Sequence, residues 1–284
     1  MDKLKILKPL RPVFWPLQVM INWLRKRSAY TIDAHLLTRK LLSDINQLDP
    51  QEIRETQEKI REFCTQRGFD METIKVWDSH VYRVMLTEKW LQEILSTTTE
   101  PVNALDLGGE SVTTDYWRYK FSSVHWQNTD WDLRYQWKLP DSTAGLILCT
   151  ELVEHLSDQP NEMFNEGFYK SGFAKLLSES YRVLAPGGYL FMTTPNVSSV
   201  MHILAMLKGE PPWLFIKHVR EYTLGEVTKE AKLAGFEIVK ARDVHCMSVM
   251  AYSDFPPIFQ LLLENNFPTD GRGDDLFVAA RKPA

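Results

Sequence analysis

Ala104-Leu105-Asp106-Leu107-Gly108-Gly109-Glu110-Ser111 is the stretch of this chain that decides the fold. Its apolar half predicts a buried β-strand over Asn103–Leu107, because a short apolar run bounded by glycine is typical of such strands. The two glycines predict a tight turn, since glycine adopts a positive φ without steric cost. Such a turn lets backbone N–H groups approach a ligand, so a strand, an acidic residue and a glycine turn in succession favour a nucleoside cofactor.

Strand and helix patterns alternate from Val102 to the end of the chain. Further strands are predicted at Leu146–Thr150, Tyr189–Thr193, Phe236–Ala241 and Leu276–Ala280. Helices are predicted at Gly172–Val183, from the capping box Thr223-Leu224-Gly225-Glu226 to Gly235, and at Phe255–Asn265, the last expected near an active-site mouth. The alternation predicts an α/β fold with a parallel sheet and helices on both faces.

The first hundred residues are predicted to be helical. Asp49-Pro50-Gln51-Glu52 is typical of a helix start, with an Asp cap and Pro at the first position, and Gly68 ends that helix. A second helix is predicted from Ser79 to Leu95, followed by a linker over 96–101. We expect residues 1–100 to form an N-terminal helical cap that helps to build the substrate pocket, and residues 101–284 to form the second domain.

Composition excludes some classes of protein. The 284 residues are 44% hydrophobic and 25% charged, with a formal net charge of −4. An acidic chain argues against nucleic-acid binding, which needs a basic surface. The three cysteines are far apart and show no metal-ligand spacing, so we expect a reducing cytoplasm and no metal site.

Residues 1–30 carry seven basic side chains against one acidic side chain, mixed with aromatic and aliphatic residues. One interpretation is an interfacial amphipathic segment that contacts the inner face of a membrane. The other is a helix that docks on the protein's own body. The apolar run Val13–Leu24 is too short to span a bilayer, which takes about 20 residues.

Three later segments, read with the glycine turn, carry a family resemblance. They are Leu146-Ile147-Leu148-Cys149-Thr150-Glu151-Leu152-Val153-Glu154-His155-Leu156, then Arg182-Val183-Leu184-Ala185-Pro186-Gly187-Gly188-Tyr189-Leu190-Phe191-Met192-Thr193-Thr194-Pro195-Asn196, and His218-Val219-Arg220-Glu221-Tyr222-Thr223. Over about residues 102–282 the chain resembles the class I S-adenosylmethionine (SAM)-dependent methyltransferases. Within that class it is similar to the ubiquinone-biosynthesis O-methyltransferases and to bacterial glycan-modifying enzymes. The resemblance implies a Rossmann-like methyltransferase sheet.

The resemblance also implies a set of cofactor-binding residues. Asp106, Gly108 and Gly109 would form the first wall, and Thr150 and Glu151 would line the methionine end of SAM. The carboxylate for the ribose would be Asp130, with Asp132 as the competing candidate, and Trp131 would stack on adenine. The segment from Gly108 to Pro140 is short for the family, so Asp130 matches either the ribose acid or the acid of the next strand.

Two positions depart from the family's glycine-rich loop, because Glu110 and Val112 stand where further glycines are usual. The Glu110 carboxylate would either attract the positive end of SAM or obstruct its methionine part. An alternative function is therefore a catalytically inactive binding or regulatory protein on this fold.

On the acceptor side, His155 is a candidate general base because histidine titrates near physiological pH. His218 is the second catalytic candidate, and Asn196, Arg220 and Tyr222 are candidate substrate contacts. Structural roles stay open for these residues, such as a helix cap for His155 or an ion pair for Arg220. The expected reaction is in-line O-methylation of a small-molecule, glycan or lipid-linked acceptor.

Overall fold

The computed structural model describes residues 30–97, 102–158, 171–212, 214–247 and 254–284. These described residues group into two compact units. The smaller unit combines residues up to Lys40 with those in the range 251–269, and the larger unit combines those in the ranges 41–250 and 270–284. The smaller unit contains α2 (Ile32–Leu41) and α11 (Phe255–Glu264), joined by hydrogen bonds from the Thr31 backbone N and Oγ1 to Gln260 Oε1 at 3.0 and 2.9 Å. The helix predicted at Phe255–Asn265 is thus confirmed, and its place near a site mouth stays a prediction.

The segment predicted to contact a membrane lies, up to residue 29, outside the described residues. No helix in the described ranges is long and apolar enough to cross a bilayer.

The larger unit is built on a six-stranded sheet in the order β2-β1-β3-β4-β6-β5. Its strands are β1 (Asn103–Asp106), β2 (His125–Asn128), β3 (Ala144–Thr150), β4 (Leu184–Pro195), β5 (Glu237–Val244) and β6 (Asp275–Arg281). The first four are parallel, and β6 runs antiparallel to β4 and β5. The predicted strands are confirmed, although β4 begins at Leu184, before the predicted start at Tyr189.

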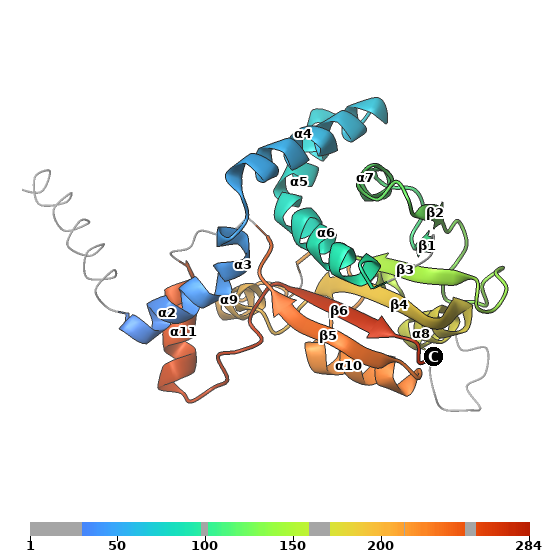
Figure 1. The fold of residues 1–284 in the computed structure, drawn as a ribbon. Coiled ribbons are helices and arrows are strands. Elements are labelled where there is room, and N and C mark those ends of the chain that lie inside the picture. Colours follow the sequence, from blue (N-terminus) through green and yellow to red (C-terminus); the bar gives the residue numbers. More distant parts are fainter. Residues whose placement is uncertain (1–29, 98–101, 159–170, 213, 248–253) are drawn as a thin grey trace, which may run out of the picture. The chain divides into compact units, whose positions relative to one another are not determined.

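Helices cover both faces of the sheet, as predicted (Figure 1). On one face lies α6 (Val81–Leu95), whose Trp90 ring is 5.8 Å from the Phe191 ring and 5.7 Å from the Phe277 ring. The other face packs against α8 (Gly172–Val183) and α10 (Leu224–Leu233). Neighbouring side chains along a strand point to opposite faces of the sheet. Leu190, next to Phe191 in β4, and Val278, next to Phe277 in β6, therefore belong to the core on this second face.

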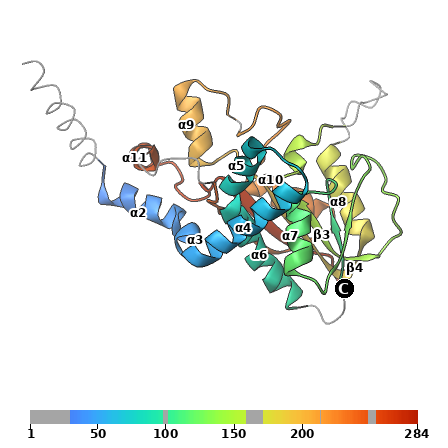
Figure 2. The ribbon, with the colours of Figure 1, turned by 90° about the horizontal axis from the view of Figure 1, so that it is seen from above.

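Four more helices stand before or beside the first strands. They are α3 (Ser43–Asn46), α4 (Pro50–Gln66), α5 (Met71–Ser79) and α7 (Val112–Lys120). The predicted start of α4 is confirmed, because the Asp49 carboxylate accepts from the Gln51 backbone N at 2.7 Å and Gly68 follows the helix at φ 72°. Figure 2 shows α4, α6 and α7 together on one side of the sheet.

The helix predicted from about Ser79 to Leu95 is confirmed as α6, within two residues at its start, whereas α5 was not predicted. Residues 71–79 form the separate helix α5, capped by Asp70, and α6 begins at Val81 after a break at His80. All of these helices belong to the same compact unit as the sheet. The functional division expected at residue 100 stays a prediction.

The capping box at Thr223 is confirmed. The Thr223 Oγ1 accepts from the Glu226 backbone N, and the Glu226 carboxylate accepts from the Thr223 backbone N at 2.9 Å. Gly235, at φ 102°, follows the end of α10. The remaining elements of this unit are the 3₁₀ turn η1 (Val153–His155) and α9 (Val200–Lys208), neither of which was predicted.

Candidate active site

A cavity of about 200 Å³ lies where the parallel strands β1 and β3 end, the usual position of a ligand in this type of sheet. The strand ends and the glycine turn form one side of it. Its lining residues are Trp77, Arg83, Val84, Thr87, Asp106, Leu107, Gly108, Gly109, Ser111, Thr113, Trp117, Thr150, Glu151 and Leu152. Five of the predicted cofactor residues, Asp106, Gly108, Gly109, Thr150 and Glu151, therefore lie around one cavity.

The glycine turn has the backbone that its sequence predicts. Gly108 has φ 99° and Gly109 has φ 85°, values that side chains other than that of glycine adopt only with strain. A Cβ on Gly108 would lie 3.3 Å from Leu152 Cδ1. The Gly108 backbone N donates to Thr129 Oγ1 at 2.9 Å, and Asn128 Nδ2 donates to the Gly109 carbonyl at 2.9 Å. The last residue of β2 and the residue that follows it therefore hold the turn in place.

Asp106 is a buried carboxyl at the edge of this cavity, only 3% exposed. Its Oδ2 accepts a hydrogen bond from Thr114 Oγ1 at 2.6 Å. Burial raises the pKa of Asp106 to about 7, against the opposing effects of the Thr114 hydrogen bond and the Arg118 charge. The carboxyl is thus poised to titrate near neutral pH.

Glu110 and Val112 leave the cavity open. The Glu110 side chain is 62% exposed and faces two arginines, with its oxygens 3.8 Å from Arg67 Nη2 and 3.6 Å from Arg118 Nη2. It is absent from the cavity lining. Val112 is buried at the first position of α7. The obstruction on which the inactive alternative rested is therefore not seen.

The predicted ribose and adenine residues follow β2, which pairs directly with β1. This settles which strand carries Asp130, because the described chain has no strand between β2 and β3. Asp130 is exposed and lies outside the cavity lining, and Asp132 pairs with Arg134 at 2.7 Å. Trp131 packs against the core, with its indole Nε1 buried and without a hydrogen-bond partner in the described structure. The roles of Asp130 and Trp131 stay predictions.

Glu151, just past β3, is held by an arginine from the N-terminal helices. Arg83 Nη1 of α6 lies 2.8 Å from Glu151 Oε2, and Thr193 Oγ1 donates to Glu151 Oε1 at 2.8 Å. The Arg83 side chain is 13% exposed. Glu151 has φ 51°, an uncommon conformation for a non-glycine residue. The ion pair thus fixes a strained residue at the cavity.

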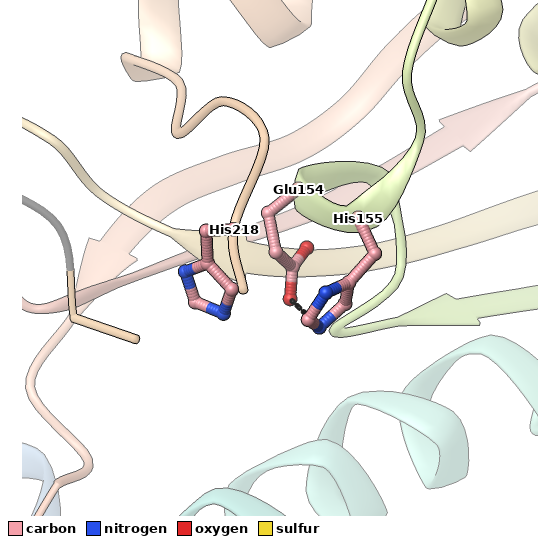
Figure 3. A group of neighbouring side chains, drawn as sticks. All are labelled: Glu154, His155 and His218. Atoms are coloured by element: carbon pink, nitrogen blue, oxygen red, sulfur yellow. Dashed lines mark ion pairs between the residues drawn. The ribbon is translucent and has the colours of Figure 1, made fainter. Parts of the chain in front are cut away.

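Glu154, His155 and His218 meet beside this strand end (Figure 3). The Glu154 carbonyl accepts from the Val219 backbone N at 2.7 Å and from the Arg220 backbone N at 3.2 Å, which ties η1 to the segment that carries His218. The rings of His155 and His218 are 4.8 Å apart. The two predicted catalytic histidines are therefore neighbours, although 63 positions separate them along the chain.

Burial of these groups shifts their protonation. Burial and the nearby charge of Glu151 raise the pKa of Glu154 well above its usual range. Burial, followed by His218, lowers the pKa of His155. Neutral imidazole is thus the favoured form of His155 at physiological pH, which is the form that accepts a proton or binds a metal.

A buried carboxylate orients His218. Glu221 Oε1 lies 2.5 Å from His218 Nδ1, Glu221 Oε2 bonds His202 Nε2, and the Leu214 backbone N donates to Glu221 Oε1 at 2.8 Å. His202 is only 1% exposed. Sequence reasoning missed this His202–Glu221–His218 chain, because His202 lies in α9 whereas Glu221 and His218 lie in the segment before α10.

The three predicted substrate residues have structural partners. Asn196 uses its amide to donate to the carbonyls of Gly271 and Gly273 at 3.0 and 2.7 Å. Arg220 pairs with Glu226 at 2.6 Å, and Tyr222 lies in the core, 4.9 Å from the Phe173 ring. None of the three lines the cavity, so their contact with a substrate stays a prediction.

Trp117 was missed and bears on the cofactor. It lines the cavity, is 1% exposed, and its Nε1 has no hydrogen-bond partner in the described part of the chain. A buried donor of this kind is costly unless a ligand or water accepts from it. Together with the acidic Asp106 and the two glycines, this unpaired donor fits a polar, positively charged nucleoside cofactor.

A larger hollow of about 390 Å³ lies away from the strand ends. It is lined from α4, α6 and α7, and five of its lining residues are glutamates: Glu52, Glu55, Glu58, Glu62 and Glu88. It contains none of the residues predicted for the site, so we assign it no role in the chemistry.

Comparison with known proteins finds similarity to methyltransferases. A "Probable S-adenosylmethionine-dependent methyltransferase" of Mycolicibacterium smegmatis is 31% identical over 100 residues, which cover 35% of this chain and 31% of the relative's length. Among solved structures, a SAM-dependent methyltransferase from Archaeoglobus fulgidus matches 75% of this chain and 100% of its own at 15% identity and TM-score 0.46. One from Mesorhizobium loti matches 67% and 96% at 14% identity and TM-score 0.39.

The family model described as "Methyltransferase domain" matches residues 49–241, which include α4–α6 and most of the sheet. The chain therefore belongs to this methyltransferase family, whose cofactor is S-adenosylmethionine.

Proposed function

We propose that this chain transfers the methyl group of SAM to a hydroxyl oxygen of a small-molecule, glycan or lipid-linked acceptor. The observation that carries the proposal is His155, a 39% exposed imidazole that follows the cavity-lining residues of β3 within one turn. Its lowered pKa keeps it neutral and able to take the proton of a hydroxyl group.

Cofactor binding is assigned to the first wall of the cavity. When bound, SAM supplies an electrophilic methyl carbon on a positively charged sulfur. The ionised Asp106 carboxylate favours that positive charge, and the Gly108–Gly109 turn leaves room for close backbone approach. Trp117 also lines the cavity, and its buried Nε1 is a hydrogen-bond donor without a partner among the described residues.

On the acceptor side, His155 accepts the proton that the hydroxyl loses as its oxygen takes the methyl group. His218, oriented by Glu221, faces the same space as His155. The acceptor is expected to lack a polyanionic backbone, because the chain is acidic overall, with net charge −4.

Cofactor binding is tested by calorimetric titration with SAM and with S-adenosylhomocysteine. We expect micromolar binding that Asp106→Ala abolishes. The matched control is Asp141→Ala, since the Asp141 side chain is 74% exposed and pairs with Arg182 far from the cavity lining. Equal affinity in Asp106→Ala and the wild type would contradict the assignment.

Catalysis is tested with methyl-labelled SAM and a panel of hydroxylated acceptors. His155→Gln should lower the rate of methyl transfer by roughly 10²–10⁴-fold while the affinity for SAM is retained. An unchanged rate in this variant would exclude His155 as the base.

We also propose that residues 1–30 contact an anionic membrane surface, on the ground of their seven basic residues against one acidic residue. Vesicle flotation of the full chain and of a chain lacking these residues tests this. Equal flotation of the two would contradict it.

A further inference from the structure

Three side chains at the edge of the candidate site have the chemistry of a metal centre. Glu154, His155 and His218 each offer one donor atom, and these atoms all lie within 4.8 Å of one another (Figure 3). Their spacing along the chain, two neighbours and one residue 63 positions later, matches no short metal motif. This is why sequence spacing alone predicts no metal.

The Glu154 carboxylate points an unpaired oxygen into this group. Its Oε2 accepts from Thr194 Oγ1 at 2.9 Å, whereas Oε1 is buried and has no hydrogen-bond partner among the described residues. The side chain is only 1% exposed, and the atom of the group nearest to Oε1 is His155 Nε2 at 4.0 Å, too far for a hydrogen bond. A buried oxygen without a donor is costly, and a cation between it and the histidines would satisfy it.

His218 is oriented as metal-binding histidines are. Its Nδ1 bonds to the Glu221 carboxylate at 2.5 Å, and Glu221 is itself held by His202 and by the Leu214 backbone N. A carboxylate that accepts from one ring nitrogen fixes the tautomer and directs the lone pair of the other nitrogen toward the ion. Thr194, the partner of Glu154 Oε2, orients the carboxylate ligand in the same way.

His155 closes the group and leaves it accessible. Its side chain is 39% exposed. An exposed ligand leaves coordination positions open to water or to an oxygen of a small molecule, which distinguishes a catalytic metal site from a closed structural one.

We propose that Glu154, His155 and His218 bind one divalent transition-metal ion. Two imidazoles and one carboxylate favour Zn²⁺, or another first-row ion such as Mn²⁺, over Mg²⁺ and Ca²⁺, which prefer oxygen ligands alone. Ligand atoms about 2 Å from a shared ion lie about 3 Å apart, so the three donors must approach one another by about 1–2 Å. The exposed His155 ring is the ligand free to make that movement.

The catalytic role of this ion rests on the function proposed above, whereas the site itself does not. Held by Glu154, His155 and His218, the ion would lower the pKa of an acceptor hydroxyl, whose proton would leave to solvent. His155 would then serve as a ligand, and the role of base proposed above would apply to the metal-free protein. The oxygen forms its bond to the methyl carbon as the carbon–sulfur bond breaks, which leaves a methyl ether and S-adenosylhomocysteine.

Metal binding is tested on the full chain without SAM. After treatment with EDTA and dialysis, the protein is titrated calorimetrically with Zn²⁺, Mn²⁺ and Mg²⁺, and metal content is measured by mass spectrometry after gel filtration. We expect one equivalent of Zn²⁺ or Mn²⁺, with affinity lowered more than about tenfold in His155→Ala and in Glu154→Gln. His125→Ala is the matched control, because His125 is an exposed histidine in β2.

Folding is checked independently, since Glu154 is buried. His155→Ala removes an exposed ring and is expected to keep the wild-type circular dichroism spectrum. Co²⁺ bound by the wild type should give visible d–d absorption that His155→Ala changes and His125→Ala leaves intact. Absence of retained metal in the wild type, or equal affinity in folded His155→Ala, would overturn the proposal.

The failure of the site and the failure of the proposed function give different results. If the protein binds one equivalent of metal but methylates no acceptor under any condition, the proposed function is wrong and the metal site stands. Methyl transfer that proceeds at full rate in metal-free protein with EDTA would remove the ion's catalytic role and leave His155 as the base.

Discussion

Asp106→Asn should make this protein more stable at alkaline pH and less dependent on pH. Burial raises the pKa of Asp106 to about 7 from an ordinary 3.8. Because the folded-state pKa lies above the unfolded one, the native state holds the extra proton between about pH 4 and pH 7. The free energy of unfolding contributed by this group therefore falls as pH rises through that window.

The magnitude follows from the size of the shift. A shift of about 3 units at 1.36 kcal/mol per unit is at most about 4 kcal/mol. Between pH 5 and pH 8 the wild type should lose about 2.5 kcal/mol through this carboxyl, and the asparagine variant should not, because its amide stays neutral. The amide of the variant keeps an oxygen that accepts the hydrogen bond from Thr114 Oγ1.

Urea unfolding at pH 5, 6, 7 and 8 measures the difference between the two proteins. We expect the variant's stability relative to the wild type to rise steadily with pH. Asp141→Asn, at an exposed carboxyl, should show no such trend. A difference that stays constant from pH 5 to pH 8 would refute the argument that burial sets the protonation of Asp106.

Three further predictions concern the surroundings of the cavity. Burial and the Arg83 charge lower the pKa of His80 to about 3, so the stability that neutral His80 contributes is present above pH 6.5 and is lost as pH falls toward 3. The wild type should therefore lose about 2 kcal/mol of its free energy of unfolding through His80 between pH 7 and pH 5, and His80→Gln should remove that part of the loss in urea unfolding. The same loss of stability in the variant and the wild type would contradict this. Arg83→Met should destabilise the fold by about 3–5 kcal/mol, because it leaves the Glu151 carboxylate without its cation. Adding Glu151→Gln should restore part of that loss, as measured by thermal unfolding. Purely additive effects of the two substitutions would show that the pair is not coupled. Gly108→Ala and Gly68→Ala should each lower stability by about 1–2 kcal/mol through backbone strain. Only Gly108→Ala, whose new Cβ meets Leu152 Cδ1, should also weaken SAM binding measured by calorimetry. Equal SAM affinity in the two variants would count against the turn as a wall of the cofactor site.

The parts of the fold that the sequence predicted are those decided by local chemistry. The strand before Gly108, the capping box at Thr223 and the Asp49 cap each depend on a few adjacent residues. Helix α5 was missed because its polar cap at Asp70 is a weak signal beside the apolar pattern of the helix that follows. Local signals therefore predicted most elements and missed a short helix that no glycine or proline separates from the next one.

The candidate site was predicted less completely, because its contacts join distant segments. Nothing near Glu151 in the sequence indicates Arg83, which comes from α6, and nothing near His218 indicates His202. The Glu110 side chain turns toward Arg67 at the end of α4 and Arg118 in α7. Its exposure therefore could not be predicted from the residues next to it in the sequence. Buried charges need partners. A search of the sequence for basic residues able to pair with each acidic residue predicted in the site would have been the one way to find Arg83.

Helices α5 and α6 contribute side chains to the lining of the cavity as well as to the fold. The cavity measures about 200 Å³, below the 300–1,000 Å³ usual for a ligand pocket. One side consists of strand ends held in the sheet, whereas the other consists of Trp77 and Arg83 from α5 and α6, on either side of the break at His80. Enlarging the cavity by moving a strand would break the backbone ladder, whereas moving these side chains breaks one ion pair, between Arg83 and Glu151. We therefore expect cofactor entry to displace the side chains of α5 and α6 that line the cavity.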